Sequence, residues 1–256
     1  MKLGIQMFGP HKLYNADPEG FLAQLKERGY SVIEACVIFG DMPLPVWKAS
    51  EIELHADRVH ALGLEVDSFH TFAGEFWNMV PEHVEVCRKA GFKHVVLGYR
   101  TEFTRENADA FIAHAIEMAD ALAEHGIGLW LHNSWQEIRA KIDGISYYEY
   151  ILRGCGGKLG AQVDTGWVVC GGEDLMEFLN RNECYVQSIH HKDVASLLNE
   201  ENRTDNVALG VGIVDTKAAF EFGKARGLLQ LVDQDFSLRE FIDDLTQSAA
   251  YLHGLN

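Results

Sequence analysis

Six residues that could bind a metal ion or move a proton accompany the apolar, strand-like runs of the chain: Glu34, His70, His132, Asp164, His190 and Asp233. Five of them stand at or just past the last apolar residue of a run, and Glu34 lies within one. A mixed set of imidazoles and carboxylates suits Mn²⁺, Co²⁺, Mg²⁺ or Zn²⁺ better than an ion that prefers thiolates. The set therefore predicts a divalent metal site, which would polarise a bound carbonyl or hydroxyl group.

Asp164 and His190 carry most of this prediction. The apolar runs 160–163 and 185–189 deliver them, and a short helical pattern joins the two runs. In a βαβ unit the carboxyl ends of the two strands meet at one edge of the sheet. We therefore expect the carboxylate and the imidazole to lie side by side.

Two further residues are expected at this edge of the sheet. Lys192 follows His190 by two positions and could hold a substrate oxyanion, although a surface salt bridge is an equal alternative. Trp167 follows an Asp-Thr-Gly turn and would offer a flat apolar wall for a sugar, or else simply cap the fold. Both residues are therefore candidates for binding substrate.

Alternating strand-like runs and amphipathic helical patterns must position these residues. Eight strands are expected, over residues 2–8, 31–37, 64–69, 92–97, 126–131, 160–163, 185–189 and 228–232, and one helix is expected from about residue 44 to 62. Eight βα units in 256 residues predict a single-domain (β/α)8 TIM barrel over 1–256, with its site at the carboxyl ends of the strands. A doubly wound sheet is the alternative, weakened because no G-x-G-x-x-G follows the first strand.

Charge and composition exclude several classes of partner. The formal charge is −16, from 38 acidic and 22 basic residues, so nucleic acid and anionic membranes should be repelled. The start of the chain does not resemble a targeting leader and no apolar run reaches 18 residues, which predicts a cytoplasmic protein. An aromatic-rich loop over residues 69–77 is expected to be a lid or the interface of a homodimer.

The chain resembles the sugar phosphate isomerase/epimerase family of xylose isomerase-like TIM barrels along nearly its whole length. The most specific motifs are VDTGW at the sixth strand and H-x-K-D at the seventh. Supporting motifs are KLGIQMF, VIEA, GFKHVVLG, LHNSWQEI, LGVGIVD and VDQD. The resemblance implies a divalent metal at the barrel mouth and chemistry at a carbon next to a carbonyl.

The resemblance also implies a ligand set. Asp164 and His190 match the ligands of the sixth and seventh strands, and Asp233 stands where the family usually has Glu in a Glu-Gln-Asp motif. His132 matches the first His of a His-Asn-His-x-x-Glu-Phe pattern, whose second His is replaced by Ser134. The expected metal ligands are thus His132, Asp164, His190 and Asp233.

Roles in catalysis follow from the same comparison. Family epimerases move protons with paired glutamates on opposite faces of the substrate, and here His132 and Asp233 take their places. Glu137, about one helical turn beyond His132, could supply the missing acid or grip hydroxyls, and Lys192 completes the catalytic candidates. The candidates for binding substrate are Glu34, His70 and Trp167.

The sequence therefore predicts a metal-dependent isomerase or epimerase of a sugar, sugar acid or polyol, acting by proton abstraction next to a carbonyl. A first alternative is a lyase or dehydratase acting on keto-sugars or inositol derivatives, which would use the same enolate and expel a leaving group. A second is a carbohydrate-binding barrel without turnover, because two family carboxylates are lost. Related metal-dependent endonucleases need a basic face, which the charge excludes.

Overall fold

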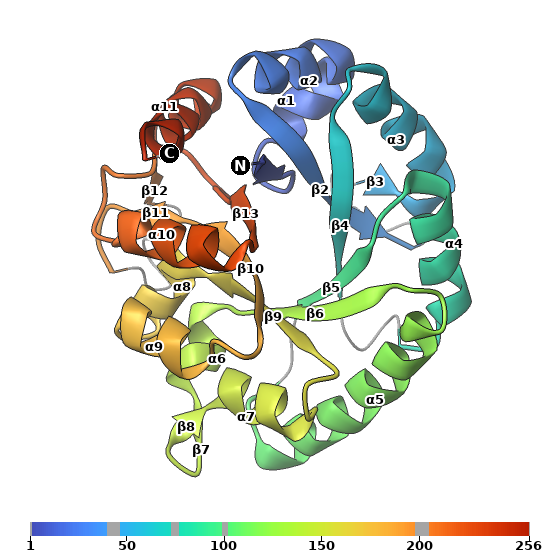
Figure 1. The fold of residues 1–256 in the computed structure, drawn as a ribbon, viewed down its shortest axis with the longest axis vertical. Helices are drawn as coiled ribbons and strands as arrows, with labels where there is room; N and C mark the ends of the chain where they lie inside the picture. Colours follow the sequence, from blue (N-terminus) through green and yellow to red (C-terminus); the bar gives the residue numbers. More distant parts are fainter. Residues whose placement is uncertain (1, 40–46, 73–76, 99–101, 198–204, 256) are drawn as a thin grey trace.

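Eight parallel strands close into a barrel in the computed structural model, which describes residues 2–39, 47–72, 77–98, 102–197 and 205–255 (Figure 1). The first strand pairs with both the second and the last, which closes the sheet. In spatial order the barrel strands are β1 (Leu3–Gln6), β2 (Tyr30–Ile38), β4 (Glu65–Phe72), β5 (His94–Gly98), β6 (Gly128–His132), β9 (Gly160–Asp164), β10 (Val186–His191) and β13 (Leu229–Val232). The predicted TIM barrel is confirmed.

Helices surround the barrel and cover its outer face (Figure 1). The longer ones are α2 (Pro18–Glu27), α3 (Ile52–Ala61), α4 (Val80–Ala90), α5 (Arg105–Ala123), α7 (Tyr147–Gly154), α9 (Leu175–Arg181), α10 (Thr216–Arg226) and α11 (Phe241–Gly254). Short helices α1 (His11–Ala16), α6 (Trp135–Arg139) and α8 (Thr165–Cys170) lie in the connections. Each longer helix buries an apolar stripe against the strands, as Phe111, Ala115 and Met118 do on α5.

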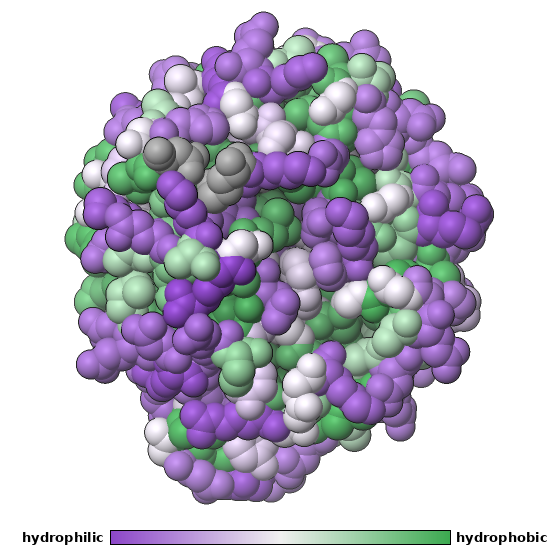
Figure 2. Space-filling model, in the orientation of Figure 1, coloured by the Kyte–Doolittle hydropathy of each residue, from purple (hydrophilic) through white to green (hydrophobic). Residues whose placement is uncertain are grey.

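Hydrophilic residues dominate much of the periphery in the view of Figure 2, as the large excess of acidic side chains requires. The apolar side chains of strands and helices instead form one continuous core. Among the described residues, no helix is both long enough and apolar enough to cross a bilayer.

The prediction of one helix over residues 44–62 was wrong in its first part. Residues 44–46 lie outside the described residues, and the chain then forms β3 (Trp47–Lys48) and a 3-10 turn η1 (Ala49–Glu51) before α3 begins. Trp47 is buried, its backbone pairs with Val37 of β2, and its ring stacks on His55 at 4.8 Å. Tertiary contacts of this indole therefore override the helical pattern.

The third strand also differs from expectation. It runs to Phe72, so His70 lies inside β4 rather than just after a strand. Residues 73–76 of the aromatic loop lie outside the described residues, and Trp77 packs on Phe111 of the same chain, with ring centroids 5.1 Å apart. A homodimer or lid formed by this loop stays a prediction.

Candidate active site

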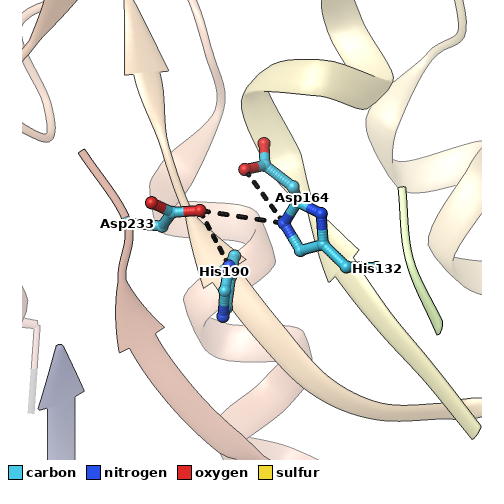
Figure 3. A group of neighbouring side chains, drawn as sticks. All are labelled: His132, Asp164, His190 and Asp233. Atoms are coloured by element: carbon cyan, nitrogen blue, oxygen red, sulfur yellow. Dashed lines mark hydrogen bonds and ion pairs between the residues drawn. The ribbon is translucent and has the colours of Figure 1, made fainter. Parts of the chain in front are cut away.

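Four of the predicted residues converge at the carboxyl ends of four neighbouring strands (Figure 3). His132 and Asp164 are the last residues of β6 and β9, His190 lies on β10 in register with Asp164, and Asp233 directly follows β13. One ligand atom from each lies within 4.8 Å of all the others. Parallel pairing thus brings together residues up to 101 positions apart in the sequence.

The geometry of this cluster leaves polar atoms facing one another without hydrogen bonds. His132 Nε2 lies 3.6 Å from Asp164 Oδ2 and 3.7 Å from Asp233 Oδ2, too far for hydrogen bonding. His190 Nδ1 lies 2.8 Å from Asp233 Oδ2. Within the described part of the chain, His132 Nε2 and Asp233 Oδ1 are buried and have no hydrogen-bond partner, and Asp164 Oδ2 makes ion pairs but no hydrogen bond.

These atoms fit a divalent cation. Buried polar atoms without partners are costly, and a cation between two carboxylates and two imidazoles would satisfy them. Nitrogen and oxygen donors of this kind are those that bind zinc and similar borderline ions. The side chains of Asp164 and His190 are fully buried, whereas His132 is 14% exposed, so the cluster is reached from the His132 side.

Lys192 extends into the cluster from the end of β10. Its Nζ lies 2.9 Å from Asp164 Oδ2, 3.3 Å from Asp233 Oδ2 and 2.7 Å from Asp235 Oδ2. Burial opposes its charge, but these three carboxylates overcome that effect and raise the pKa of Lys192 well above its usual value. The predicted alternative of a surface salt bridge is therefore excluded, because Lys192 is only 1% exposed.

The same charges shift both imidazoles of the cluster. Burial lowers the pKa of His190, but Glu34 and Asp233 overcome this and raise it to about 10. Burial likewise opposes the charge of His132, but the neighbouring carboxylates of Asp164 and Asp233 overcome this and raise its pKa. A metal ion would compete with protons for these nitrogen atoms, so metal affinity should fall at low pH.

Glu137 lies beside the cluster on the short helix α6. Its carboxylate accepts hydrogen bonds from the backbone N–H and the Oγ of Ser134, the latter at 2.8 Å, which forms a capping box. Burial raises the pKa of Glu137 to about 7, against the opposing effect of these hydrogen bonds. Near neutral pH this group can therefore both donate and accept a proton.

A cavity of about 240 Å³ opens onto these groups. Its polar lining includes His70, His132, Glu137, Lys192 and Asp233. Its apolar lining includes Phe8, Val37, Ile38, Trp167 and Phe236. A cavity of this size, lined by both apolar and charged side chains, suits a small polar molecule.

Trp167 lines this cavity, and Lys192 Nζ lies 4.5 Å from the centre of its ring. His70 lines the cavity too, with its ring stacked on that of His190 at 5.4 Å. Glu34 is fully buried below the cavity and is not part of its lining. The structure thus gathers all the predicted residues at one end of the barrel, with Glu34 one layer deeper.

Sequence reasoning missed Asp235 and Gln162. Asp235 pairs with Lys192 and lines the cavity, and Gln162 links His70 to Glu34 through its amide group. Each lies two positions from a predicted ligand, Asp233 or Asp164. Since alternate residues of a strand face the same side, this spacing was the signal that could have revealed Gln162.

Comparisons with solved structures agree with the fold. A sugar phosphate isomerase/epimerase from Parabacteroides distasonis has a TM-score of 0.82 and 18% identity over 98% of this chain and 94% of its own. The probable 3-DHS dehydratase AsbF from Bacillus anthracis has a TM-score of 0.75 and 12% identity over the full length of both chains. The IOLI protein with a bound zinc atom has a TM-score of 0.72 and 15% identity over 99% and 96%.

Neither a protein-family model nor a curated protein matches the sequence. At these identities the comparisons establish a shared fold. The chain is a TIM barrel of the type found in sugar phosphate isomerase/epimerase and xylose isomerase domain proteins.

Proposed function

We propose that this protein is a divalent-metal-dependent isomerase or epimerase of a small carbohydrate, which abstracts a proton next to a carbonyl group. The observation that carries the proposal is the convergence of His132, Asp164, His190 and Asp233 on one point, beside the cavity that His132 and Asp233 line. The names of the structural neighbours support the reaction class, and the zinc in one of them supports a metal. Zn²⁺, Mn²⁺, Co²⁺ and Mg²⁺ all remain candidates.

The four clustered residues would hold the ion, which when bound would supply Lewis-acid polarisation of a substrate oxygen. Glu137 is placed in the cavity wall with a pKa near neutrality, so it can exchange a proton with a substrate held there. His132 and Asp233, at the edge of the same cavity, are the further groups we assign to proton transfer.

Other residues would bind and orient the substrate. Lys192 carries a fixed positive charge on the cavity wall, which would stabilise negative charge that develops on a substrate oxygen. Trp167 contributes an apolar indole and His70 an imidazole to the cavity wall. Glu34 lies behind His70, with its Oε1 2.9 Å from His70 Nε2, and would act on substrate binding through that ring.

Metal content and solvent exchange test the proposal. Purified protein should take up about one divalent ion per chain, and Asp164→Asn should lose it, because one of four ligands becomes a neutral amide. With metal bound, a substrate sugar in D₂O should acquire deuterium at the carbon next to its carbonyl. Elemental analysis and NMR of the sugar measure the two effects.

Asp120→Asn is the matched control, because Asp120 is exposed and pairs only with Lys158 in the described structure. This variant should keep both the metal and the exchange reaction. A wild-type protein that takes up no metal would contradict the proposed function. Metal uptake and carbohydrate binding without deuterium exchange would instead indicate a binding protein without turnover.

The second candidate function is a lyase or dehydratase, favoured by the fold shared with the probable 3-DHS dehydratase AsbF. It would use the same metal cluster and the same proton abstraction, then expel a leaving group. Product analysis distinguishes the two functions: an isomerase or epimerase conserves the mass of the sugar, whereas a dehydratase releases water and leaves a product lighter by that amount.

A further inference from the structure

A buried carboxylate lies directly below the metal cluster. Glu34 of β2 is 0% exposed, and its Oε1 lies 2.6 Å from His190 Nε2 and 2.9 Å from His70 Nε2. Its Oε2 accepts hydrogen bonds from the hydroxyl of Ser68 and from Gln162 Nε2, the latter at 2.7 Å. Oε2 is therefore satisfied by hydrogen bonds, whereas Oε1 makes close ion-pair contacts with the two imidazoles and no hydrogen bond.

The two nitrogens of His190 face in opposite directions. Nδ1 faces Asp233 in the metal cluster, whereas Nε2 faces Glu34 below it. A carboxylate accepts hydrogen bonds and cannot donate them, so Glu34 requires a proton on His190 Nε2. With that proton in place, the lone pair for a metal ion is the one on Nδ1, which points into the cluster.

We propose that Glu34 is a positioning residue, which holds His190 in the tautomer and orientation that bind metal through Nδ1. The inference rests on the proposed function, because it takes His190 as a ligand. Imidazoles that bind metals commonly donate their second N–H to a carboxylate, which fixes the ring and makes it a better ligand. Glu34 thus acts on the cluster although it does not line the cavity.

A second metal ion held by Glu34, His70 and His190 is the main competing interpretation, because these three residues also offer closely spaced ligand atoms. The hydrogen bonds of Gln162 argue against it. Its amide nitrogen donates to Glu34 Oε2, so its oxygen must be the group 2.7 Å from His70 Nε2. The opposite amide orientation would place that oxygen against the carboxylate.

His70 Nε2 must therefore donate a proton to Gln162 and has no lone pair for a metal. Around Glu34, Ser68 and Gln162 donate hydrogen bonds to Oε2, His190 Nε2 faces Oε1 at 2.6 Å, and the N–H of His70 is used by Gln162. A network of this kind orients its donors in a fixed direction. It supports a positioning role for Glu34 rather than a second metal site.

Glu34→Gln tests the proposal with almost no change in volume. Either the new amide donates toward His190 Nε2, which removes the required proton, or it turns and opposes the donor of Gln162. Zinc affinity, measured by competition with a chelator, should weaken about 10- to 100-fold. In zinc-saturated protein labelled with ¹⁵N-histidine, the His190 signals should also change from those of an Nδ1-bound, Nε2-protonated ring.

Matched variants separate this effect from a loss of stability. Glu149→Gln alters another buried glutamate, which binds Arg181 and Ser146 away from the cluster, so it should leave zinc affinity unchanged. Ser68→Ala removes a donor to Oε2 only and should change affinity much less than Glu34→Gln. If Glu34→Gln does not fold, Glu34→Asp keeps the charge, lengthens the contact to His190 and should weaken zinc affinity while the tautomer persists.

Each result has a definite meaning. Weaker zinc binding with altered His190 signals supports the proposal. In Glu34→Gln, unchanged affinity, or weaker affinity with unchanged His190 signals, overturns it. If only Glu34→Asp folds, unchanged zinc affinity in that variant overturns it. Two zinc ions per wild-type chain, with one lost in Glu34→Gln, overturns it in favour of a second metal site. A wild-type protein that binds no zinc, manganese, cobalt or magnesium contradicts the proposed function itself.

Discussion

Competition between burial and nearby charges sets the protonation states of the individual side chains in and beside the cluster. Asp233 would be forced toward its neutral form by burial, yet Lys192 and His190 keep its pKa well below the usual value. Glu137 has no cation of this kind at hydrogen-bond distance among the described residues, and burial raises its pKa to about 7. Two carboxyl groups that line the same cavity thereby acquire different protonation states at neutral pH, which is the arrangement that acid and base roles require.

We expect Glu137→Gln to change the pH dependence of turnover. If Glu137 is the general acid, its protonated form is active, so turnover should fall as the pH rises through about 7. The amide cannot donate an acidic proton, so turnover by the variant should be slower by about 100-fold or more. Its pH profile should also lack this fall, the limb near pH 7. Glutamine at the same position preserves the capping box with Ser134, so the helix should remain folded.

The pH profile of turnover, measured with metal bound, checks this prediction. Glu177→Gln is the matched control, because Glu177 occupies the equivalent position of α9 and is exposed. A profile that keeps its limb near pH 7 in Glu137→Gln would assign the limb to another group and contradict the role of Glu137.

At the scale of elements, helices α7 and α9 are joined by a buried glutamate. Glu149 closes a capping box with Ser146 at the start of α7 and lies 2.8 Å from Arg181 Nε of α9. Burial opposes its charge, but hydrogen bonds from Arg181 and Ser146 overcome this and lower its pKa to about 2. This pair therefore fixes the two helices relative to each other.

Glu149→Gln should reduce the free energy of unfolding at neutral pH by about 1.5 to 3 kcal/mol, because a charge-assisted hydrogen bond is lost. The folded pKa of about 2 lies below the unfolded value near 4.5. The stabilising effect is thus complete above about pH 4.5 and is lost as the pH falls toward 2. Urea unfolding of both proteins between pH 2 and 7 measures the difference, which should shrink in acid.

Glu85→Gln is the control for this comparison, because among the described residues Glu85 forms only exposed ion pairs, with Arg88 and Lys89. It should change stability little at any pH. A difference between wild type and Glu149→Gln that stays constant down to pH 2 would mean that the ion pair is not its cause.

At the scale of the whole molecule, the cluster joins four consecutive strands of the closed sheet, β6, β9, β10 and β13. A bound ion would therefore connect half of the barrel, and any unfolding that separates these strands must release it. Free zinc at about 100 times its dissociation constant should raise the free energy of unfolding by about 2.7 kcal/mol. Asp164→Asn should gain much less.

Unfolding followed by both far-ultraviolet circular dichroism and tryptophan fluorescence measures this effect, and excess EDTA should reverse it. The two probes should shift together, since the strands belong to one sheet. Equal stabilisation of wild type and Asp164→Asn would place the bound zinc elsewhere on the molecule.

Much of this architecture could be predicted because it depends on local patterns. Strand-like runs such as 160–163 and 185–189 end in polar residues, and parallel pairing then leaves few positions for Asp164 and His190. The helix expected from residue 44 was misplaced because Trp47 pairs with β2, a contact that no local pattern encodes. Strand ends such as that of β4 were misjudged for the same reason.

The sequence by itself determined the barrel and the residues at its mouth, because periodicity and strand order are carried by neighbouring positions. The tertiary structure decided what each residue does there. It buried Glu34 beneath His190 instead of in the cavity wall, and it surrounded Lys192 with Asp164, Asp233 and Asp235. Such roles depend on side-chain distances and burial across strands far apart in sequence, and these exist only once the sheet has closed.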